Sequence, residues 1–184
     1  MRRTSTSIVT AVAIVAAMAS VATAQGTTPD PHSKTPGSSM TAMGTDSEFA
    51  NKAANGGKHE VEAGKFAAAK ASSAEVKAYA NRLVTDHTKG NQELMQLMKS
   101  KHIPAKDGKA EPEPWRSQSG AAFDRAFIDG AIADHEKDIA LFEAEAKDGT
   151  DADLKAWAAK TLPTLREHLK AAQDLRSKLP STDQ

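Results

Sequence analysis

Residues 101–118 read KHIPAKDGKAEPEPWRSQ and interrupt a chain that otherwise carries helical patterns. Pro104, Pro112 and Pro114, together with glycine and charged residues, exclude a helix across this stretch. Two pairs of long amphipathic segments flank it. An extended link of this length can reach about 60 Å, whereas a helix of about 25 residues is only about 38 Å long. The link can therefore run along a whole bundle and set the helices on its two sides parallel.

The segment before the break predicts two helices joined by a very short connection. Thr45 and Glu48 form a capping box that opens the first helix, which continues to about Ala71. Ser72 and Glu75 form a second capping box, and the helix that it opens runs to about Lys99. Because only a residue or two connect them, these helices must form an antiparallel hairpin. Their inward positions are Phe49, Ala53, Gly56, Glu60, Ala63 and Ala67, then Val76, Ala80, Leu83, His87, Gly90, Leu94 and Leu97.

The segment after the break repeats this design. Ser119 is placed to cap a third helix, which stops at Gly149, and a fourth helix starts within a few residues. The run Glu75–Ala80 is echoed by Asp153–Ala158, so that each half looks like a copy of the other. The inward positions are Ile128, Ile132, His135, Ile139, Phe142 and Ala146, then Leu154, Ala158, Thr161, Leu165, His168, Ala172 and Leu175. The sequence thus predicts an all-α, ferritin-like four-helix bundle over residues 45–180, with two hairpins and one long crossover.

The N-terminus has the pattern of a secretory signal peptide. Arg2 and Arg3 precede an apolar run that is too short to span a membrane, and small residues end at Ala24. We therefore expect residues 1–24 to be cleaved off, no transmembrane segment in the mature chain, and a periplasmic or secreted protein. Residues 25–44 are rich in Thr, Pro, Ser and Gly, a composition that predicts a disordered linker.

Composition limits what the mature protein can bind. The chain has 24 basic and 24 acidic residues, and loss of the signal peptide removes two arginines. A net charge of about −2 provides no electrostatic footprint for nucleic acid or for an anionic membrane. With no cysteine in the chain, disulfides and thiolate ligands are excluded. Any metal must therefore be held by imidazole and oxygen.

An acid stands beside a histidine near the middle of each predicted helix, in the pairs His59-Glu60, Asp86-His87, Asp134-His135 and Glu167-His168. One member of each pair falls on the inward face, at a similar distance from its helix start. These four side chains could bind one ion of zinc, copper, iron or manganese. The candidate ligands are Glu60, His87, His135 and His168, and the candidate neighbours are Asp86, Asp134, Glu167, His59 and Glu62.

The same four groups have a second interpretation. A hydrogen-bonded polar layer can fix the register of an alanine-rich bundle without any metal. The protein would then be a non-catalytic envelope bundle that binds a partner protein or associates with itself. A di-iron centre is disfavoured, because Val84, Ile132 and Leu165 stand where its Glu-x-x-His motif needs glutamate. No catalytic residue is predicted, and enzymatic activity stays open.

Several runs resemble the ferritin-like "domain of unknown function 4142" family of exported bacterial proteins, over about residues 46–176. The resemblance implies a ferritin-like four-helix bundle in the periplasm or outer membrane, and it implies no activity. The runs that carry it are Gly56–Gly64, Ser73–Ala80 leading to Asp86–Lys89, Asp134–Lys137 with Phe142-Glu143, and Thr161–Leu169.

Overall fold

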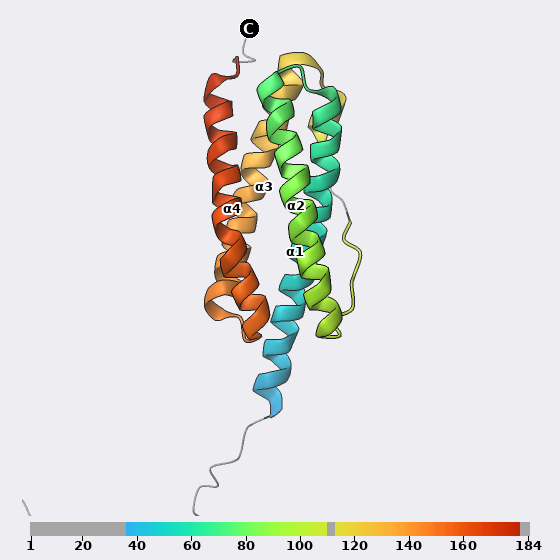
Figure 1. Cartoon of the computed structure of the whole chain (residues 1–184), viewed down its shortest axis with the longest axis vertical. Coiled ribbons are helices and arrows are strands. Elements are labelled where there is room, and N and C mark those ends of the chain that lie inside the picture. The colour runs from blue at the N-terminus through green and yellow to red at the C-terminus, as the bar shows by residue number, and fades with distance from the viewer. Residues whose placement is uncertain (1–35, 110–112, 181–184) are drawn as a thin grey trace, which may run out of the picture. The chain divides into compact units, whose positions relative to one another are not determined.

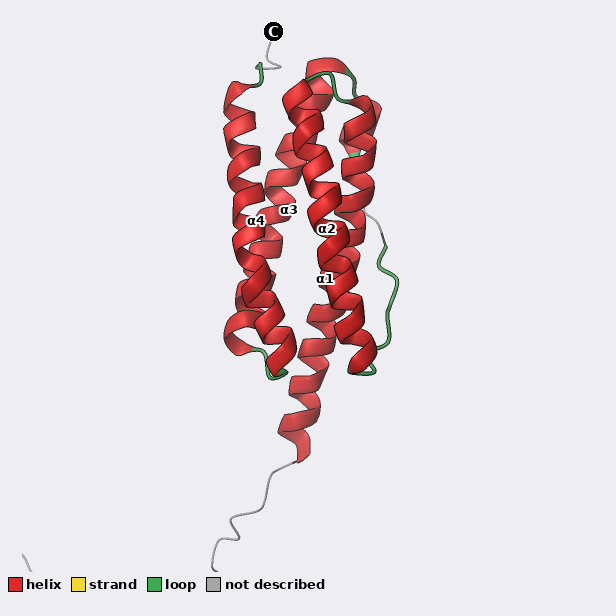
Figure 2. Cartoon of the chain, viewed as in Figure 1, coloured by secondary structure: helices red, strands yellow, loops and turns green. Residues whose placement is uncertain are grey.

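The structure is a computed structural model that describes residues 36–109 and 113–180, with side chains from residue 45 onward. Four α-helices and one short 3-10 turn make up its regular structure, and these described ranges contain no strand (Figures 1 and 2). The predicted all-α four-helix bundle is confirmed. The elements are α1 (Pro36–Lys70), α2 (Ala74–Ser100), η1 (Pro114–Ser117), α3 (Gly120–Asp148) and α4 (Ala152–Lys178).

The long link crosses from one end of the bundle to the other. The turn between α1 and α2 contacts the start of α3, because Asp124 accepts hydrogen bonds from the backbone N–H groups of Ser72 and Ser73. At the opposite end, Asp46 of α1 accepts hydrogen bonds from Thr150 and Asp151, between α3 and α4. Helices α2 and α3 are therefore parallel, as Figure 1 shows. This is the predicted arrangement of two hairpins and a crossover, and it is consistent with the ferritin-like class.

The crossover is attached to the bundle at both of its ends. Asn51 and Asn55 of α1 donate side-chain hydrogen bonds to the carbonyls of Pro104 and Lys106, at 3.2 and 2.9 Å. Further along, the buried indole of Trp115 packs against aromatic rings of α1 and α3, with centroids 5.3–5.9 Å apart. Burial of Trp115 and hydrogen bonds from asparagine side chains to the backbone of the crossover thus hold this segment, whose prolines prevent it from forming an α-helix.

Two helix starts differ from the predictions. Helix α1 begins at Pro36 rather than at Thr45, and proline suits the first helical position because its missing N–H has no partner there anyway. Part of the predicted linker is thus helical. The cap of α2 is Ser73 rather than Ser72, since its hydroxyl accepts from the N–H of Val76. Residues 1–35, which include the predicted signal peptide, lie outside the described residues, and the predicted domain limits stay predictions.

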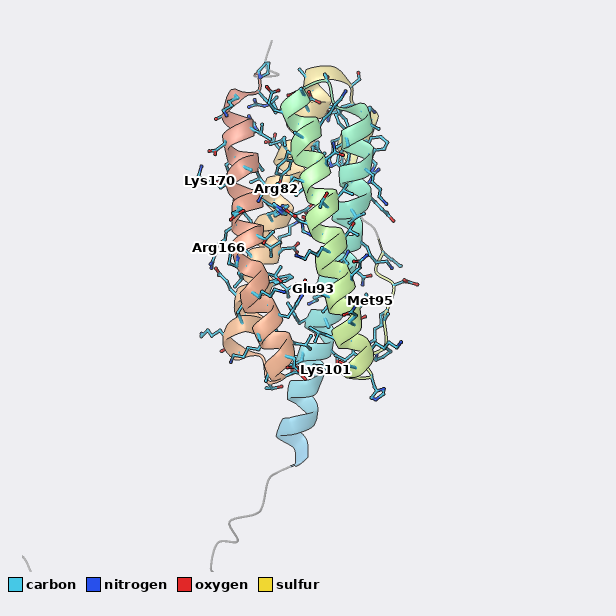
Figure 3. The ribbon with its side chains drawn as sticks, viewed as in Figure 1. Arg82, Glu93, Met95, Lys101, Arg166 and Lys170 are labelled. Carbon is cyan, nitrogen blue, oxygen red and sulfur yellow. The ribbon has the colours of Figure 1, made fainter. Side chains whose placement is uncertain are left out.

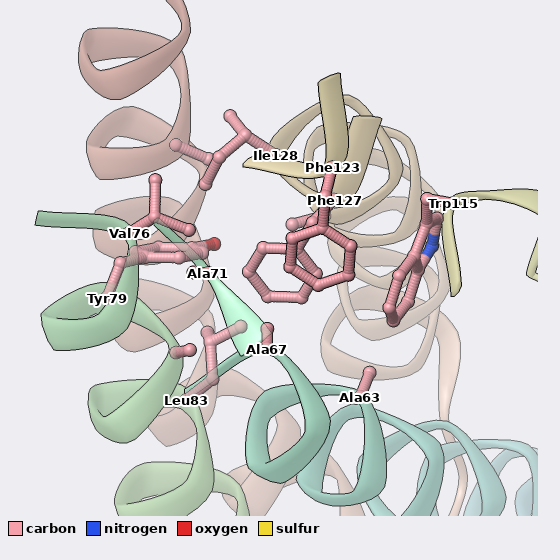
Figure 4. Packing of buried hydrophobic residues seen from close by; sticks show 13 residues of the cluster. Ala63, Ala67, Ala71, Val76, Tyr79, Leu83, Trp115, Phe123, Phe127 and Ile128 are labelled. Atoms are coloured by element: carbon pink, nitrogen blue, oxygen red, sulfur yellow. The ribbon is translucent and has the colours of Figure 1, made fainter. Parts of the chain in front are cut away.

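Two apolar clusters fill the bundle, one towards each end. The first cluster gathers around Trp115, Phe123 and Phe127 near the α1–α2 turn (Figure 4). The second gathers around Phe49, Phe142 and Trp157. On every helix the inward residue between the two clusters is polar. The members of this polar layer are Glu60 on α1, His87 on α2, His135 on α3 and His168 on α4.

Glu145, near the α3–α4 turn, gives a pH-dependent prediction. Burial, and then the charges of Asp46 and Asp151, raise the pKa of Glu145 to about 7 from 4.5. The stability that its neutral form contributes is thus present below about pH 4.5 and is lost as pH rises through about 7. Glu145→Gln should raise the free energy of unfolding by about 1–2 kcal/mol at pH 8, and much less at pH 5. Urea denaturation at both pH values measures this.

The matched control is Glu136→Gln, which changes an exposed glutamate of the same helix. It should give no gain that depends on pH. An equal gain for Glu145→Gln at pH 5 and pH 8 would show that ionisation of Glu145 does not strain the fold.

Candidate metal centre

The polar layer brings together one side chain from each of the four helices. His135 and His168 are fully buried, and Glu60 is 5% exposed. Ligand atoms of His87, His135 and His168 all lie within 4.8 Å of one another. The glutamate lies against two of these imidazoles, since its Oε2 is 2.9 Å from His87 Nδ1 and its Oε1 is 3.3 Å from His135 Nδ1. The structure thus groups the three histidines, and Glu60 lies beside two of them without belonging to that group of mutually close ligand atoms. The role of all four side chains as ligands stays a prediction.

Hydrogen bonds to the outer nitrogens orient two of the rings. His135 Nδ1 lies 2.8 Å from the carbonyl oxygen of Ala131, and His168 Nε2 lies 2.8 Å from a carboxylate oxygen of Asp86. Because a carbonyl and an ionised carboxylate can only accept, both of these ring nitrogens must carry the proton. The other two nitrogens, His135 Nε2 and His168 Nδ1, then face each other at 3.3 Å.

The two facing nitrogens require a positive species between them. Burial lowers the pKa of His168 to about 4, so this ring is neutral at pH 7 and its Nδ1 presents a lone pair. If His135 is also neutral, its Nε2 presents a second lone pair to the first. Such an arrangement is repulsive, and either a shared proton or a metal ion would relieve it.

The other half of the layer contains acceptors without hydrogen bonds. Both carboxylate oxygens of Glu60 and Nε2 of His87 are buried, and none of them has a hydrogen-bond partner of good geometry in the described part of the chain. Burial favours the neutral acid, but the adjacent His87 and the other histidines outweigh it and lower the pKa of Glu60. For His87, burial acts downward, but Glu60 raises the net pKa. An anionic, under-coordinated carboxylate in a buried site is the kind of group that binds a cation.

Asp86 and Glu167 act across helices, as the 100° step between adjacent helical residues predicts. Asp86 contacts His168 on α4 rather than its neighbour His87. Its pKa is lowered, because the contacts with His168 and Arg82 outweigh the opposing effect of burial. Arg82 of α2, which is labelled in Figure 3, lies 3.4 Å from Asp86 and 2.6 Å from Glu167 of α4. Asp86 therefore orients His168 directly, whereas Glu167 forms an ion pair only with Arg82 among the described residues.

The remaining candidate neighbours lie away from the ring nitrogens. His59 contacts Glu113 of the crossover at 3.1 Å, so it helps to attach that segment. Asp134 forms an ion pair with Lys137 at 3.5 Å, and Glu62 is exposed. All three line a cleft beside the layer.

Sequence reasoning missed one acid, Asp138 of α3. Asp138 lines the same cleft and the same small cavity as Glu60. Burial and then the charge of Glu60 raise the pKa of Asp138 to about 7. Asp138 has no histidine beside it in the sequence, so the pattern of adjacent acid–histidine pairs does not include it. The internal repeat could have found it, because Asp138 follows Glu60 by the same interval, 78 residues, that separates Asp153 from Glu75.

Comparison with known proteins agrees with the fold and names no activity. A family model described as "Domain of unknown function (DUF4142)" matches residues 27–175. No curated protein matches the chain by sequence. No helix in the described ranges is long and apolar enough to cross a membrane.

Two solved structures are similar in fold. One is the conserved hypothetical protein rv2844 from Mycobacterium tuberculosis, with a TM-score of 0.65 and 12% identity, covering 78% of this chain and 98% of that one. The other is the "putative secreted protein DUF305" from Streptomyces coelicolor, with a TM-score of 0.66 and 11% identity, covering 73% and 93%. At these identities the likeness concerns the fold alone.

Proposed function

The chain belongs to the DUF4142 family of unknown function, and we propose that it is an exported bundle that binds one transition-metal ion in its polar layer. The residues proposed to bind the ion directly are Glu60, His87, His135 and His168. Export is supported by the signal-peptide pattern of residues 1–24.

One observation carries this proposal: the 3.3 Å between His135 Nε2 and His168 Nδ1. Two nitrogens bound to a tetrahedral metal at about 2.0–2.1 Å are about 3.3–3.4 Å apart. The two rings are therefore already separated as two ligands of one ion would be. Asp86 and the carbonyl of Ala131 hold their outer nitrogens, in the way that carboxylates and carbonyls support metal-bound histidines.

The set of donors fits an intermediate transition metal. Three imidazoles and a carboxylate are nitrogen and oxygen ligands, which suit zinc, copper, iron or manganese. Nε2 of His87 and the oxygens of Glu60, which lie against His87 and His135 without a hydrogen bond of good geometry, would provide the remaining donor atoms. Since a cation would satisfy these buried groups, its binding would also stabilise the folded chain.

A structural polar layer is the second candidate. Glu60 lies 3.3 Å from His135, so it could serve as the counter-charge of a protonated His135 whose proton lies between the two facing nitrogens. The layer would then fix the register of the helices, and the bundle would act by binding a partner protein or a second copy of itself. A proton and a metal compete for the same place, so the two candidates can be separated experimentally.

A melting experiment tests the metal proposal. Zinc at a free concentration of about 100 times its Kd should raise the Tm of the chelator-treated mature protein by about 8 °C at pH 7.5, because only the folded state binds it. The shift should fade below about pH 6.5, where protons compete for the imidazole nitrogens. Circular dichroism measures both.

Two variants complete this test. The His135→Ala/His168→Ala double variant should lose the shift, whereas His102→Ala, which removes an exposed histidine outside the layer, should keep it. No shift in the unmodified protein, or an equal shift in the double variant, would leave the structural polar layer as the function of these residues.

A further inference from the structure

The polar layer is open on one side and nearly closed on the other. A cleft of about 370 Å³ lies between α1, α3 and the crossover, and Glu60 and Asp138 are among its lining residues. On the side of α2 and α4, the layer borders a cavity of only about 40 Å³, lined in part by Gly90, Thr161 and His168. A cavity of that size holds about one or two waters. Of these two sides, the cleft therefore gives a hydrated cation the room to approach.

The charge of the cleft favours a cation. Its lining contains five carboxylates and three lysines, so the carboxylates are in excess. Two of these lysines are already near carboxylates, since Lys58 lies 3.6 Å from Asp107 and Lys137 lies 3.5 Å from Asp134. A cleft lined by an excess of one charge concentrates ions of the opposite charge and speeds their association.

Two carboxylates connect the cleft to the layer. Glu60 is buried, and within the described ranges its oxygens lie 2.9 Å from His87 Nδ1 and 3.3 Å from His135 Nδ1 without a hydrogen bond of good geometry. Asp138 lines both the cleft and the small cavity, so it lies at the boundary between the open and the closed side. Its two carboxylate oxygens lie over Gly56, each 3.7 Å from where a Cβ would stand. Among the described residues Asp138 has no hydrogen bond or ion pair that would compete with a cation.

We propose that the cleft is the path by which a divalent cation reaches the layer, and that Asp138 is the carboxylate that receives the ion before it moves to Glu60 and the histidines. This inference rests on the proposed function. A carboxylate oxygen of Asp138 replaces one water molecule of the hydrated ion at the boundary between the cleft and the polar layer. The ion then needs only a short displacement to reach the oxygens of Glu60, because Glu60 and Asp138 line the same cleft and the same small cavity.

Stopped-flow mixing of the metal-free mature protein with Co²⁺ tests the role of Asp138. The visible absorbance of bound cobalt reports the rate and the final amount. Asp138→Asn should slow association by about tenfold or more, because it removes the carboxylate that first binds the ion as well as one attractive charge, and should still reach one bound ion. Asp134→Asn is the matched control, because it also removes a cleft carboxylate of α3 but leaves Asp138 in place. It should change the rate by less than about threefold.

A second pair of variants tests the path itself. Gly56→Met places a side chain in the cleft beside Asp138, whereas Gly90→Met places one on the α2–α4 side, where nothing lies within 4 Å of an added Cβ. The first should slow cobalt uptake and the second should not. Slower uptake only in Gly90→Met would assign the path to the other side.

The outcomes separate this inference from the function on which it rests. If the unmodified protein binds no cobalt, the proposed function fails and the path fails with it. If it binds one ion, and Asp138→Asn and Gly56→Met take up that ion at the unmodified rate, only the path and the role of Asp138 are refuted.

Discussion

Replacing Asp124 with alanine is expected to lower the free energy of unfolding by about 3 kcal/mol and the Tm by about 10 °C. The side chain of Asp124 is 2% exposed, and its two oxygens accept hydrogen bonds from Ser72 N–H at 2.9 Å and Ser73 N–H at 2.7 Å. Alanine would leave both N–H groups of the turn without their acceptor in part-buried positions, and charge-assisted bonds of this kind are stronger than neutral ones. Thermal unfolding followed by circular dichroism measures the loss.

Two further variants put this expectation in context. Asp46→Ala should cost a similar amount, because Asp46 accepts bonds at the opposite end from Thr150 N–H, from the Thr150 hydroxyl and from Asp151 N–H. Asp174→Ala removes an exposed carboxylate and should cost less than about 0.5 kcal/mol. If Asp124→Ala melts within a degree or two of Asp174→Ala, Asp124 does not hold the α1–α2 turn as described.

Replacing His135 with leucine is expected to destabilise the metal-free protein by about 3 kcal/mol or more. The change removes a fully buried partner of Glu60 and of His168, and it leaves the Glu60 charge with fewer neighbours to compensate it. Breaking a buried charged pair from one side costs about 3–5 kcal/mol, because the remaining charge stays buried. Urea denaturation in the presence of a chelator measures the change.

A double variant shows whether the charge of Glu60 is the cause. In Glu60→Gln/His135→Leu the carboxylate becomes a neutral amide that can still bond His87, so much of the lost stability should return. A double variant that is less stable than His135→Leu alone would mean that packing, rather than an unpaired charge, explains the loss.

The sequence predicted the topology well because local signals marked two short turns, and because the link of residues 101–118 is long enough to cross the bundle. The Ser72-Ser73 and Gly149 regions marked short turns that force hairpins, and the prolines of residues 101–118 marked a link long enough to cross the bundle. The helical period then placed Glu60, His87, His135 and His168 on inward faces, where the structure has them between two apolar clusters. Local periodicity is sufficient for such predictions, because each depends on one helix at a time.

The remaining details depend on contacts between helices. The α1–α2 turn is held by Asp124, far along the chain, which accepts hydrogen bonds from the N–H groups of Ser72 and Ser73. Asp138 belongs beside the layer because Gly56 on another helix leaves space for its carboxylate. Likewise, the partner of Asp86 is a histidine on α4. No pattern within one segment contains this information.

The repeat also explains why the described residues contain one cluster of histidines rather than two. Asp124 follows Asp46 by the same 78 residues that relate Asp138 to Glu60, so the turn-holding aspartates and the paired acids are repeated. The histidines are not repeated, since Gly57 and Gly90 occupy the positions that correspond to His135 and His168. The imidazoles of α3 and α4 therefore have no counterpart in the first half, and the bundle contains a single cluster of three histidines among its described residues.

The metal content of the mature protein tests the central claim most directly. The protein should be purified without an affinity tag, equilibrated with a mixture of zinc, copper, iron and manganese, and dialysed before elemental analysis. We predict about one equivalent of a single transition metal per chain, kept in His102→Ala and lost in the His87→Ala/His168→Ala double variant. A folded, unmodified protein without bound metal, or a folded double variant that keeps a full equivalent, would contradict the claim.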